Sequence, residues 1–137
     1  MTTTPNQPVR QIAAFAFLSW LGAFIHNMAD LPGLTLLSPE NSVPALITLV
    51  LFLTWLQLPN KRLTTLVLLA WVFFPQFLGG GILSVFPFSF WPWNPPQTLF
   101  HYSMHIVYAV AQLPLIIALI RQLRANSHAK QMVGENT

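Results

Sequence analysis

Four apolar segments, each long enough to cross a lipid bilayer, limit what this chain can fold into. They cover about residues 11–31, 42–58, 63–81 and 97–120, and shorter polar or proline-containing stretches separate them. A helix rises about 1.5 Å per residue, so roughly 20 residues cross the hydrocarbon core of a membrane. The sequence therefore predicts an all-α integral membrane protein, built as a four-helix bundle.

The low charge of the chain supports this prediction. Charged residues make up 7% of the 137 residues, hydrophobic residues make up 54%, and the mean hydropathy is +0.57. Soluble domains carry about 25% charged residues, which they need to cover their surface. The absence of cysteine excludes disulfides and thiolate metal sites. The few basic residues form no continuous patch, so we expect no binding of nucleic acid.

The basic residues indicate the orientation of the spans. All of them fall on one side of a four-span arrangement, before the first span, between the second and third, and after the fourth: Arg10, Lys61, Arg62, Arg121, Arg124 and Lys130. On the other side, the charged residues at the two remaining loops are the acidic Asp30 and Glu40. The positive-inside rule then places both termini in the cytoplasm. We expect the protein in a bacterial cytoplasmic membrane.

The ends of the chain are polar. Residues 1–9 are expected to form a polar N-terminal tail, residues 10–124 the transmembrane domain, and residues 125–137 a polar cytoplasmic tail. A signal peptide is the alternative interpretation of the first span. Its apolar run is long, and Asn27-Met28-Ala29 is a poor cleavage site, so we expect the span to be retained.

Proline and glycine interrupt the third span and the segment after it. Pro75 and the run Gly79–Gly81 predict that the third helix is kinked or broken there. Residues 82–96 hold four prolines and five aromatic rings, which predicts an aromatic loop at the outer membrane interface. Asn60 is expected to cap the third span, and residues 94–97 resemble a capping box at the start of the fourth.

Two pairs of polar residues lie inside the apolar spans at the same predicted depth. His26 and Asp30 are four residues apart near the outer end of the first span. His101 and His105 are four residues apart in the first turns of the fourth span. Residues at this spacing share one face of a helix. If the first and fourth spans are neighbours, the two pairs meet in the outer half of the bilayer.

Three imidazoles and one carboxylate are suitable ligands for a transition metal such as Zn, Cu or Fe. The sequence therefore predicts a metal site formed by His26, Asp30, His101 and His105. Further polar residues in the spans are expected to support these ligands: Tyr108, Gln112 and Gln76.

Other interpretations of the same histidines remain open. They can be hydrogen-bonding groups that hold helices together in an accessory or scaffold subunit. They can line the path of a proton or small solute. His26 and His105 can also be axial ligands of haem b. In that case the ring would pack on small residues of the two spans: Gly22, Ala23, Ala109 and Ala111.

The sequence identifies no catalytic residues. It contains no phosphate-binding loop, no dinucleotide-binding glycine motif, no nucleophile elbow and no H-E-x-x-H zinc motif, which favours a protein that is not an enzyme. The expected partners are the lipid bilayer and either copies of the chain or a larger membrane complex. Residues 101–115, with HYSMH and AQLPL, resemble a His-x-x-Met-His helix in copper-delivery proteins of cytochrome oxidases, which have more spans.

Overall fold

The structure is a computed structural model that describes residues 7–90 and 94–134, with side chains as far as Ser127. This part of the chain is helical and contains no strand. Its elements in chain order are α1 (Gln7–Asp30), α2 (Pro39–Gln57), α3 (Lys61–Trp71), the π-helix η1 (Val72–Ile82), the 3₁₀-helix η2 (Leu83–Val85) and α4 (Leu99–Gly134). Four stretches are long and apolar enough to cross a membrane: Gln7–Asp30, Pro39–Gln57, Lys61–Val85 and Leu99–Ser127.

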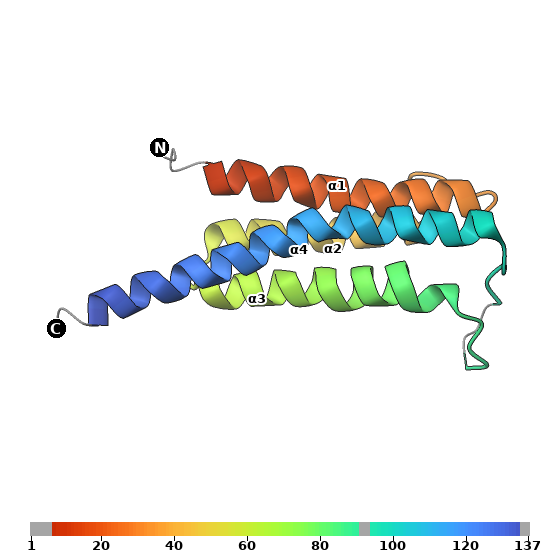
Figure 1. The fold of residues 1–137 in the computed structure, drawn as a ribbon. Coiled ribbons are helices and arrows are strands. Elements are labelled where there is room, and N and C mark those ends of the chain that lie inside the picture. The colour runs from red at the N-terminus through yellow and green to blue at the C-terminus, as the bar shows by residue number, and fades with distance from the viewer. Residues whose placement is uncertain (1–6, 91–93, 135–137) are drawn as a thin grey trace.

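The helices form a ring in which each contacts its neighbours in the sequence, and α4 closes the ring against α1. α1 lies along α4, and α3 with η1 lies on the other side of α4 (Figure 1). The pairing of the first and fourth spans is therefore confirmed. Apolar side chains from all four helices pack in the half of the bundle near the termini, among them Ile12, Trp55, Leu68, Leu115 and Leu119.

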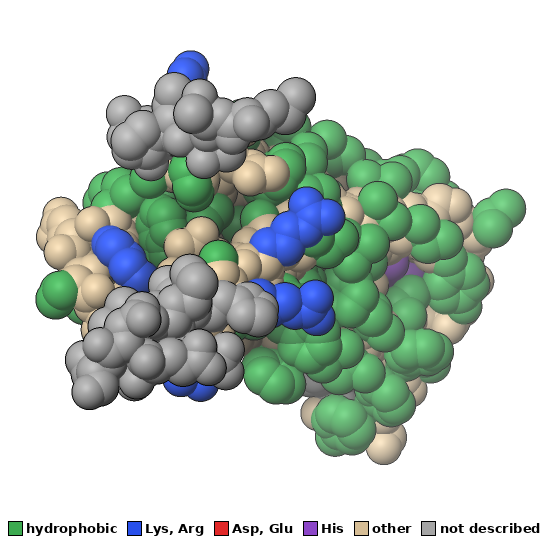
Figure 2. Space-filling view, turned by 60° about the vertical axis from the view of Figure 1, so that its left-hand side comes forward, with side chains coloured by type: hydrophobic (Ala, Val, Ile, Leu, Met, Phe, Trp, Pro, Cys, Tyr) green, Lys and Arg blue, Asp and Glu red, His purple; other side chains and the backbone are tan. Residues whose placement is uncertain are grey.

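The two ends of the bundle carry opposite charges. Both chain termini lie at one end (Figure 1), where Lys and Arg side chains gather (Figure 2). We name this the basic end. Asp30 ends α1 and Glu40 lies in the first turn of α2, so both lie at the opposite end, which we name the acidic end. The charge separation read from the sequence is thus present in the fold.

The helices extend beyond the predicted spans at both termini. α1 begins at Gln7, inside the predicted tail 1–9, and residues 1–6 lie outside the described part of the chain. α4 continues to Gly134 through most of the predicted tail 125–137 and projects past the other helices (Figure 1). This segment contains no proline and no glycine before Gly134, so nothing in it terminates a helix.

The third span departs from a regular α-helix around the predicted positions, and it does so as a π-helix rather than as a break. The α-helix changes to a π-helix at Val72, three residues before Pro75, and the wider turns continue through Gly79–Gly81 to Ile82. A proline lacks a backbone N–H and its ring crowds the preceding turn of an α-helix. The wider π turn absorbs this disturbance without ending the helix. The predicted aromatic loop begins later than residue 82, because η2 continues to Val85. Two of its aromatic residues, Trp91 and Trp93, lie outside the described residues.

The structure confirms one of the two predicted N-terminal helix caps. Asn60 caps α3, since its Oδ1 accepts a hydrogen bond from the Leu63 N–H at 3.1 Å, as predicted. The predicted capping box at residues 94–97 is wrong. Thr98 is the N-cap of α4, and its Oγ1 accepts a hydrogen bond from the His101 N–H at 3.2 Å. A threonine hydroxyl immediately before the first helical turn reaches these N–H groups directly.

Glycines on α1 and on η1 allow α4 to approach these two helices closely. A Cβ on Gly22 of α1 would overlap the Cβ of Ala111. A Cβ on Gly80 of η1 would lie 2.6 Å from the Tyr108 hydroxyl oxygen, and one on Gly81 would lie 3.2 Å from Ala109 Cβ. Small residues at these contacts bring helix backbones together, as is common between membrane helices.

We expect Gly22→Val to weaken the contact between α1 and α4. The added carbons have no space beside Ala111, and overpacking of this kind costs about 1–3 kcal/mol. Ala14→Val adds two carbons at an exposed position of the same helix and should leave stability nearly unchanged. Thermal unfolding of the purified protein in detergent measures both. Equal melting temperatures for the two variants would contradict this packing.

Candidate metal centre

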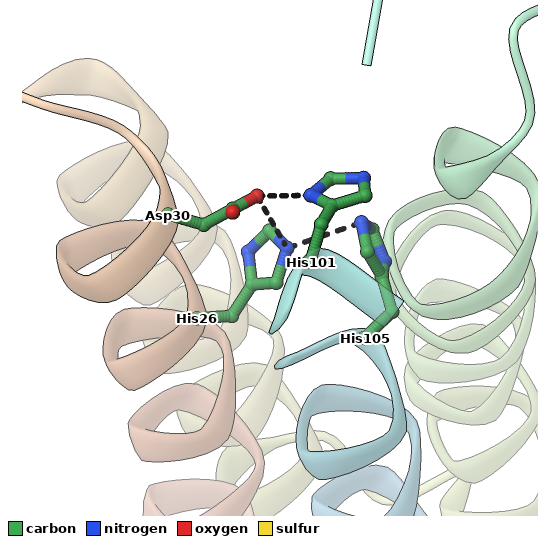
Figure 3. A group of neighbouring side chains, drawn as sticks. All are labelled: His26, Asp30, His101 and His105. Atoms are coloured by element: carbon green, nitrogen blue, oxygen red, sulfur yellow. Dashed lines mark hydrogen bonds and ion pairs between the residues drawn. The ribbon is translucent and has the colours of Figure 1, made fainter. Parts of the chain in front are cut away.

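The structure brings the four predicted ligand residues to one place. His26 and Asp30 project from the last turns of α1, and His101 and His105 from the first turns of α4 (Figure 3). Each residue offers one ligand atom, and these atoms all lie within 4.8 Å of one another. The side chains of His26, Asp30 and His101 are 8%, 5% and 5% exposed, and His105 is buried as well.

The distances within this cluster are close to those around a metal ion. His26 Nε2 lies 3.1 Å from His105 Nε2 and 3.8 Å from Asp30 Oδ2. Asp30 Oδ2 also accepts a hydrogen bond from His101 Nδ1. Two ligands on a tetrahedral ion with bonds of 2.0–2.1 Å are about 3.3 Å apart. The separations of His26 Nε2 from His105 Nε2 and from Asp30 Oδ2 are therefore near the distance between two ligands of one ion.

A series of amide hydrogen bonds determines which His26 nitrogen carries the proton. Asn41 Nδ2 donates to the Thr35 carbonyl at 2.8 Å, so Asn41 Oδ1 is an acceptor. It accepts from Asn27 Nδ2 at 2.9 Å, and Asn27 Nδ2 also donates to the Glu40 carbonyl. Asn27 Oδ1 is then the acceptor that faces His26 Nδ1 at 2.9 Å. Neutral His26 must therefore carry its proton on Nδ1 and present a lone pair at Nε2.

This assignment leaves a conflict at His105. If His105 is protonated on Nε2, it donates to His26, but its buried Nδ1 lone pair finds no donor. Backbone groups of Gly80 and Gly81 lie beside that ring. If His105 is protonated on Nδ1, the lone pairs of two Nε2 atoms face each other at 3.1 Å. A cation between the two Nε2 atoms removes the conflict, because both lone pairs then bind it.

His101 presents a second buried atom without a partner. Its Nδ1 is engaged by Asp30, whereas its Nε2 is buried and makes no hydrogen bond. Buried polar atoms in proteins are almost always paired, and an exception indicates a water or an ion at that position. A carboxylate that holds one nitrogen of a histidine while the other binds a metal is a frequent arrangement.

The predicted supporting residues lie deeper in the bundle, toward its middle. The Tyr108 ring lies 5.5 Å from the His26 ring, and its hydroxyl donates to Gln76 Oε1 at 2.7 Å. Gln112 bonds with Ser19 and the Tyr108 carbonyl rather than with any of the four ligand residues. Tyr108 therefore touches the cluster directly, whereas Gln76 and Gln112 act only through other residues.

A cavity of about 560 Å³ connects the cluster to the surface at the acidic end. Besides the four ligand residues it is lined by Asn27, Leu31, Glu40, Gly80, Ser84, Asn94, Pro95, Pro96 and Tyr108. Glu40, Asn94 and Pro96 are exposed, so the cavity opens there. The volume far exceeds the ~30 Å³ that one water molecule occupies in the liquid. Ions and small solutes therefore have an approach to the cluster from this side.

Two buried polar residues, Thr64 and Thr65, lie near the basic end and bond there with Trp55, Asn60 and Lys61. The polar residues on the other helices of the cluster do not continue that far. On α1, η1 and α4 they stop at Ser19, Gln76 and Gln112. Beyond these positions α1, α3, η1 and α4 contribute buried apolar side chains, namely Ile12, Ala16, Leu68, Val72, Leu115 and Leu119. Four of these, Leu68, Val72, Leu115 and Leu119, are 0% exposed. The polar column is therefore closed at its inner end.

The haem alternative does not fit this structure. The small residues that would accept the ring are used in helix contacts: Gly22 meets Ala111, and Gly81 meets Ala109. Two axial nitrogens on one iron are about 4 Å apart with the ring between them, whereas the Nε2 atoms of His26 and His105 are 3.1 Å apart and in contact. α1 and α4 would have to separate to admit a porphyrin.

Comparisons of the chain with protein-family models, curated proteins and solved structures gave no match. The interpretation of the site therefore depends on its own geometry. That geometry includes residues that the sequence did not single out, Asn41 above all. Asn41 lies near the start of α2 and is 2% exposed. A polar residue just before the predicted second span was the available signal, but its partners come from another helix and a loop.

We expect the amide hydrogen bonds to control the proton on His26. In the native protein at a pH where His26 is neutral, the proton should lie on Nδ1. Asn27→Ala removes the acceptor and should give a mixture of the two neutral forms, whereas Asn27→Asp keeps an acceptor and should retain the Nδ1 form. The ¹⁵N shifts of the imidazole nitrogens, assigned by loss of signals in His26→Ala, measure this. A native His26 protonated on Nε2 would refute the assignment.

Proposed function

We propose that this chain is an integral membrane protein whose four helices hold a divalent transition-metal ion near the acidic end. The observation that carries this proposal is the convergence of four ligand atoms, from two buried i,i+4 pairs on different helices, within 4.8 Å. The ligand atoms are Nε2 of His26, Nε2 of His105, Oδ2 of Asp30 and one ring nitrogen of His101. Asn27 supports the site by holding His26 in the form that can bind a metal.

The ligand set favours a borderline divalent ion. Three imidazoles and one carboxylate are suitable for Zn²⁺, and also for Cu²⁺ and Fe²⁺, whereas Cu(I) prefers sulfur ligands. Asp30 has a side chain that is 5% exposed, and an isolated carboxylate is costly to bury. A divalent cation would offset this charge and bind the facing Nε2 lone pairs of His26 and His105 at the same time.

In the proposed orientation the acidic end faces away from the cytoplasm. All described Lys and Arg residues lie at the basic end, so the positive-inside rule places that end, with both termini, in the cytoplasm. The ion then reaches the site from outside the cytoplasm, through the cavity beside Glu40. The polar column ends at Ser19, Gln76 and Gln112. This favours an ion that stays bound at the site, rather than an ion that is transported across the membrane.

A structural role for the histidines is the second candidate. The hydrogen bonds from His105 to His26 and from His101 to Asp30 join α4 to α1, and interhelical bonds of this kind contribute about 0.6–2 kcal/mol each. In that case the protein is an accessory or scaffold subunit. The facing Nε2 atoms of His26 and His105 favour the metal site over this role, because a cation between them would bind both lone pairs.

Metal content and its effect on stability separate the two candidates. Native protein should bind Zn²⁺ at one ion per chain, and an ion at 100 times its Kd should raise the free energy of unfolding by about 2.7 kcal/mol. His105→Ala should weaken binding by more than ~100-fold, beyond the loss typical of residues that only orient a ligand. The double variant His101→Ala/His105→Ala should bind none.

His128→Ala is the matched control for this experiment. His128 lies on α4, 23 positions after His105, which corresponds to about 35 Å along the helix. This variant should bind the ion as the native protein does. If the native protein shows neither bound metal nor metal-dependent stability, while the double variant is merely less stable, the histidines have the structural role.

Labelling of introduced cysteines tests the proposed orientation, because the native chain contains no cysteine. Leu37, in the loop at the acidic end, is 83% exposed, and Pro59, in the loop at the basic end, is exposed as well. A maleimide that cannot cross membranes should modify Leu37→Cys in intact cells. It should modify Pro59→Cys only after permeabilisation. The reverse pattern would show the opposite orientation.

A further inference from the structure

A groove at the basic end forms a second site, separate from the metal centre. It has a volume of about 230 Å³ and lies between α3 and α4, lined by Arg62, Leu66, Leu123, Arg124 and Ser127. Arg62 and Leu66 are four residues apart on α3, and Leu123 and Ser127 are four residues apart on α4, so each pair shares one helix face. The groove thus has one polar, cationic part and one apolar part.

The two arginines of this groove have no partner among the described residues. Neither is part of a hydrogen bond or an ion pair there, whereas Lys61 beside them donates to the carbonyls of Trp55 and Leu56. The described acids, Asp30 and Glu40, both lie at the opposite end of the bundle. Figure 2 shows the basic side chains at this end with no carboxylate on the described part of the same face. Two guanidinium groups are therefore available to an anion.

The order of residues along the helices matches the order of groups in a phospholipid. Arg62 lies in the first turn of α3, at the proposed cytoplasmic boundary, and Leu66 lies one turn deeper in the span. On α4, Leu123 lies deeper than Arg124 and Ser127. Guanidinium groups bind phosphate through paired N–H donors, and the leucines offer a surface to an acyl chain. A free phosphate would use only the arginines.

We propose that this groove binds an anionic phospholipid of the cytoplasmic leaflet, with its headgroup phosphate at Arg62 and Arg124 and an acyl chain on Leu66 and Leu123. Basic pockets between membrane helices on this side are known to bind such headgroups. One basic residue near anionic lipid contributes about fivefold in affinity, so the pair should contribute about 25-fold.

Purified full-length protein in a neutral detergent, titrated with phosphatidylglycerol or phosphatidylcholine, tests the proposal by native mass spectrometry. One phosphatidylglycerol should bind with about 25-fold preference over phosphatidylcholine. Arg62→Gln/Arg124→Gln should lose this preference. Arg10→Gln/Arg121→Gln removes the same charge outside the groove and should keep it. Equal losses in the two double variants would overturn the proposal, because they would indicate only general attraction to positive charge.

A third variant and a competitor separate a lipid from a free anion. Leu66→Trp fills the apolar part of the groove and retains both arginines, so it should also weaken binding of phosphatidylglycerol. Inorganic phosphate should not displace the lipid at equal concentration, because it cannot use the leucines. Displacement by phosphate, or full binding by Leu66→Trp, would overturn the lipid assignment. Zn²⁺ binding should be unchanged in every groove variant, since the metal centre lies at the other end.

Discussion

The contact between α1 and α4 is the constraint on which the rest of this structure depends. Each of these helices carries ionisable side chains on one face, and an ionised group costs a few kcal/mol when it faces lipid. The bundle places the two faces against each other, so that His26, Asp30, His101 and His105 are buried together between the helices. Gly22 and Ala111 permit this approach, because neither has a side chain that would hold the helices apart.

The same contact divides the bundle into two halves with different chemistry. Polar side chains fill the half near the acidic end, from the cavity beside Glu40 down to Ser19, Gln76 and Gln112. Mainly apolar side chains fill the other half. A buried polar network is stable only when its members are paired, and most members here are. The exceptions, His101 Nε2 and His105 Nδ1, belong to two of the proposed ligand residues.

The π-helix shows how backbone and site are related. Pro75 interrupts the regular hydrogen bonding of the third span, and the chain responds by widening its turns. Glycines follow directly, and at Gly80 the missing side chain lets Tyr108 lie against the helix beside the His26 ring. The sequence predicted a kink or a break in this segment but could not specify a π-helix, because the packing partner of the proline and glycines comes from another helix. α4 supplies that partner and makes the wider turns favourable.

The sequence alone determined the four apolar helices, the separation of charge between the two ends and the presence of two His/Asp-containing pairs on helix faces, because these follow from local spacing and composition. It also identified the Asn60 cap, which depends on neighbours in the chain. Tertiary structure decided what depends on residues far apart in sequence. It determined, through Asn27 and Asn41, which nitrogen of His26 carries the proton. Close packing at Gly22 excluded a porphyrin, and Leu68, Leu115 and Leu119 closed the polar column. Helix spacing tells which residues share a face, whereas the neighbour of that face is chosen by packing among all four helices.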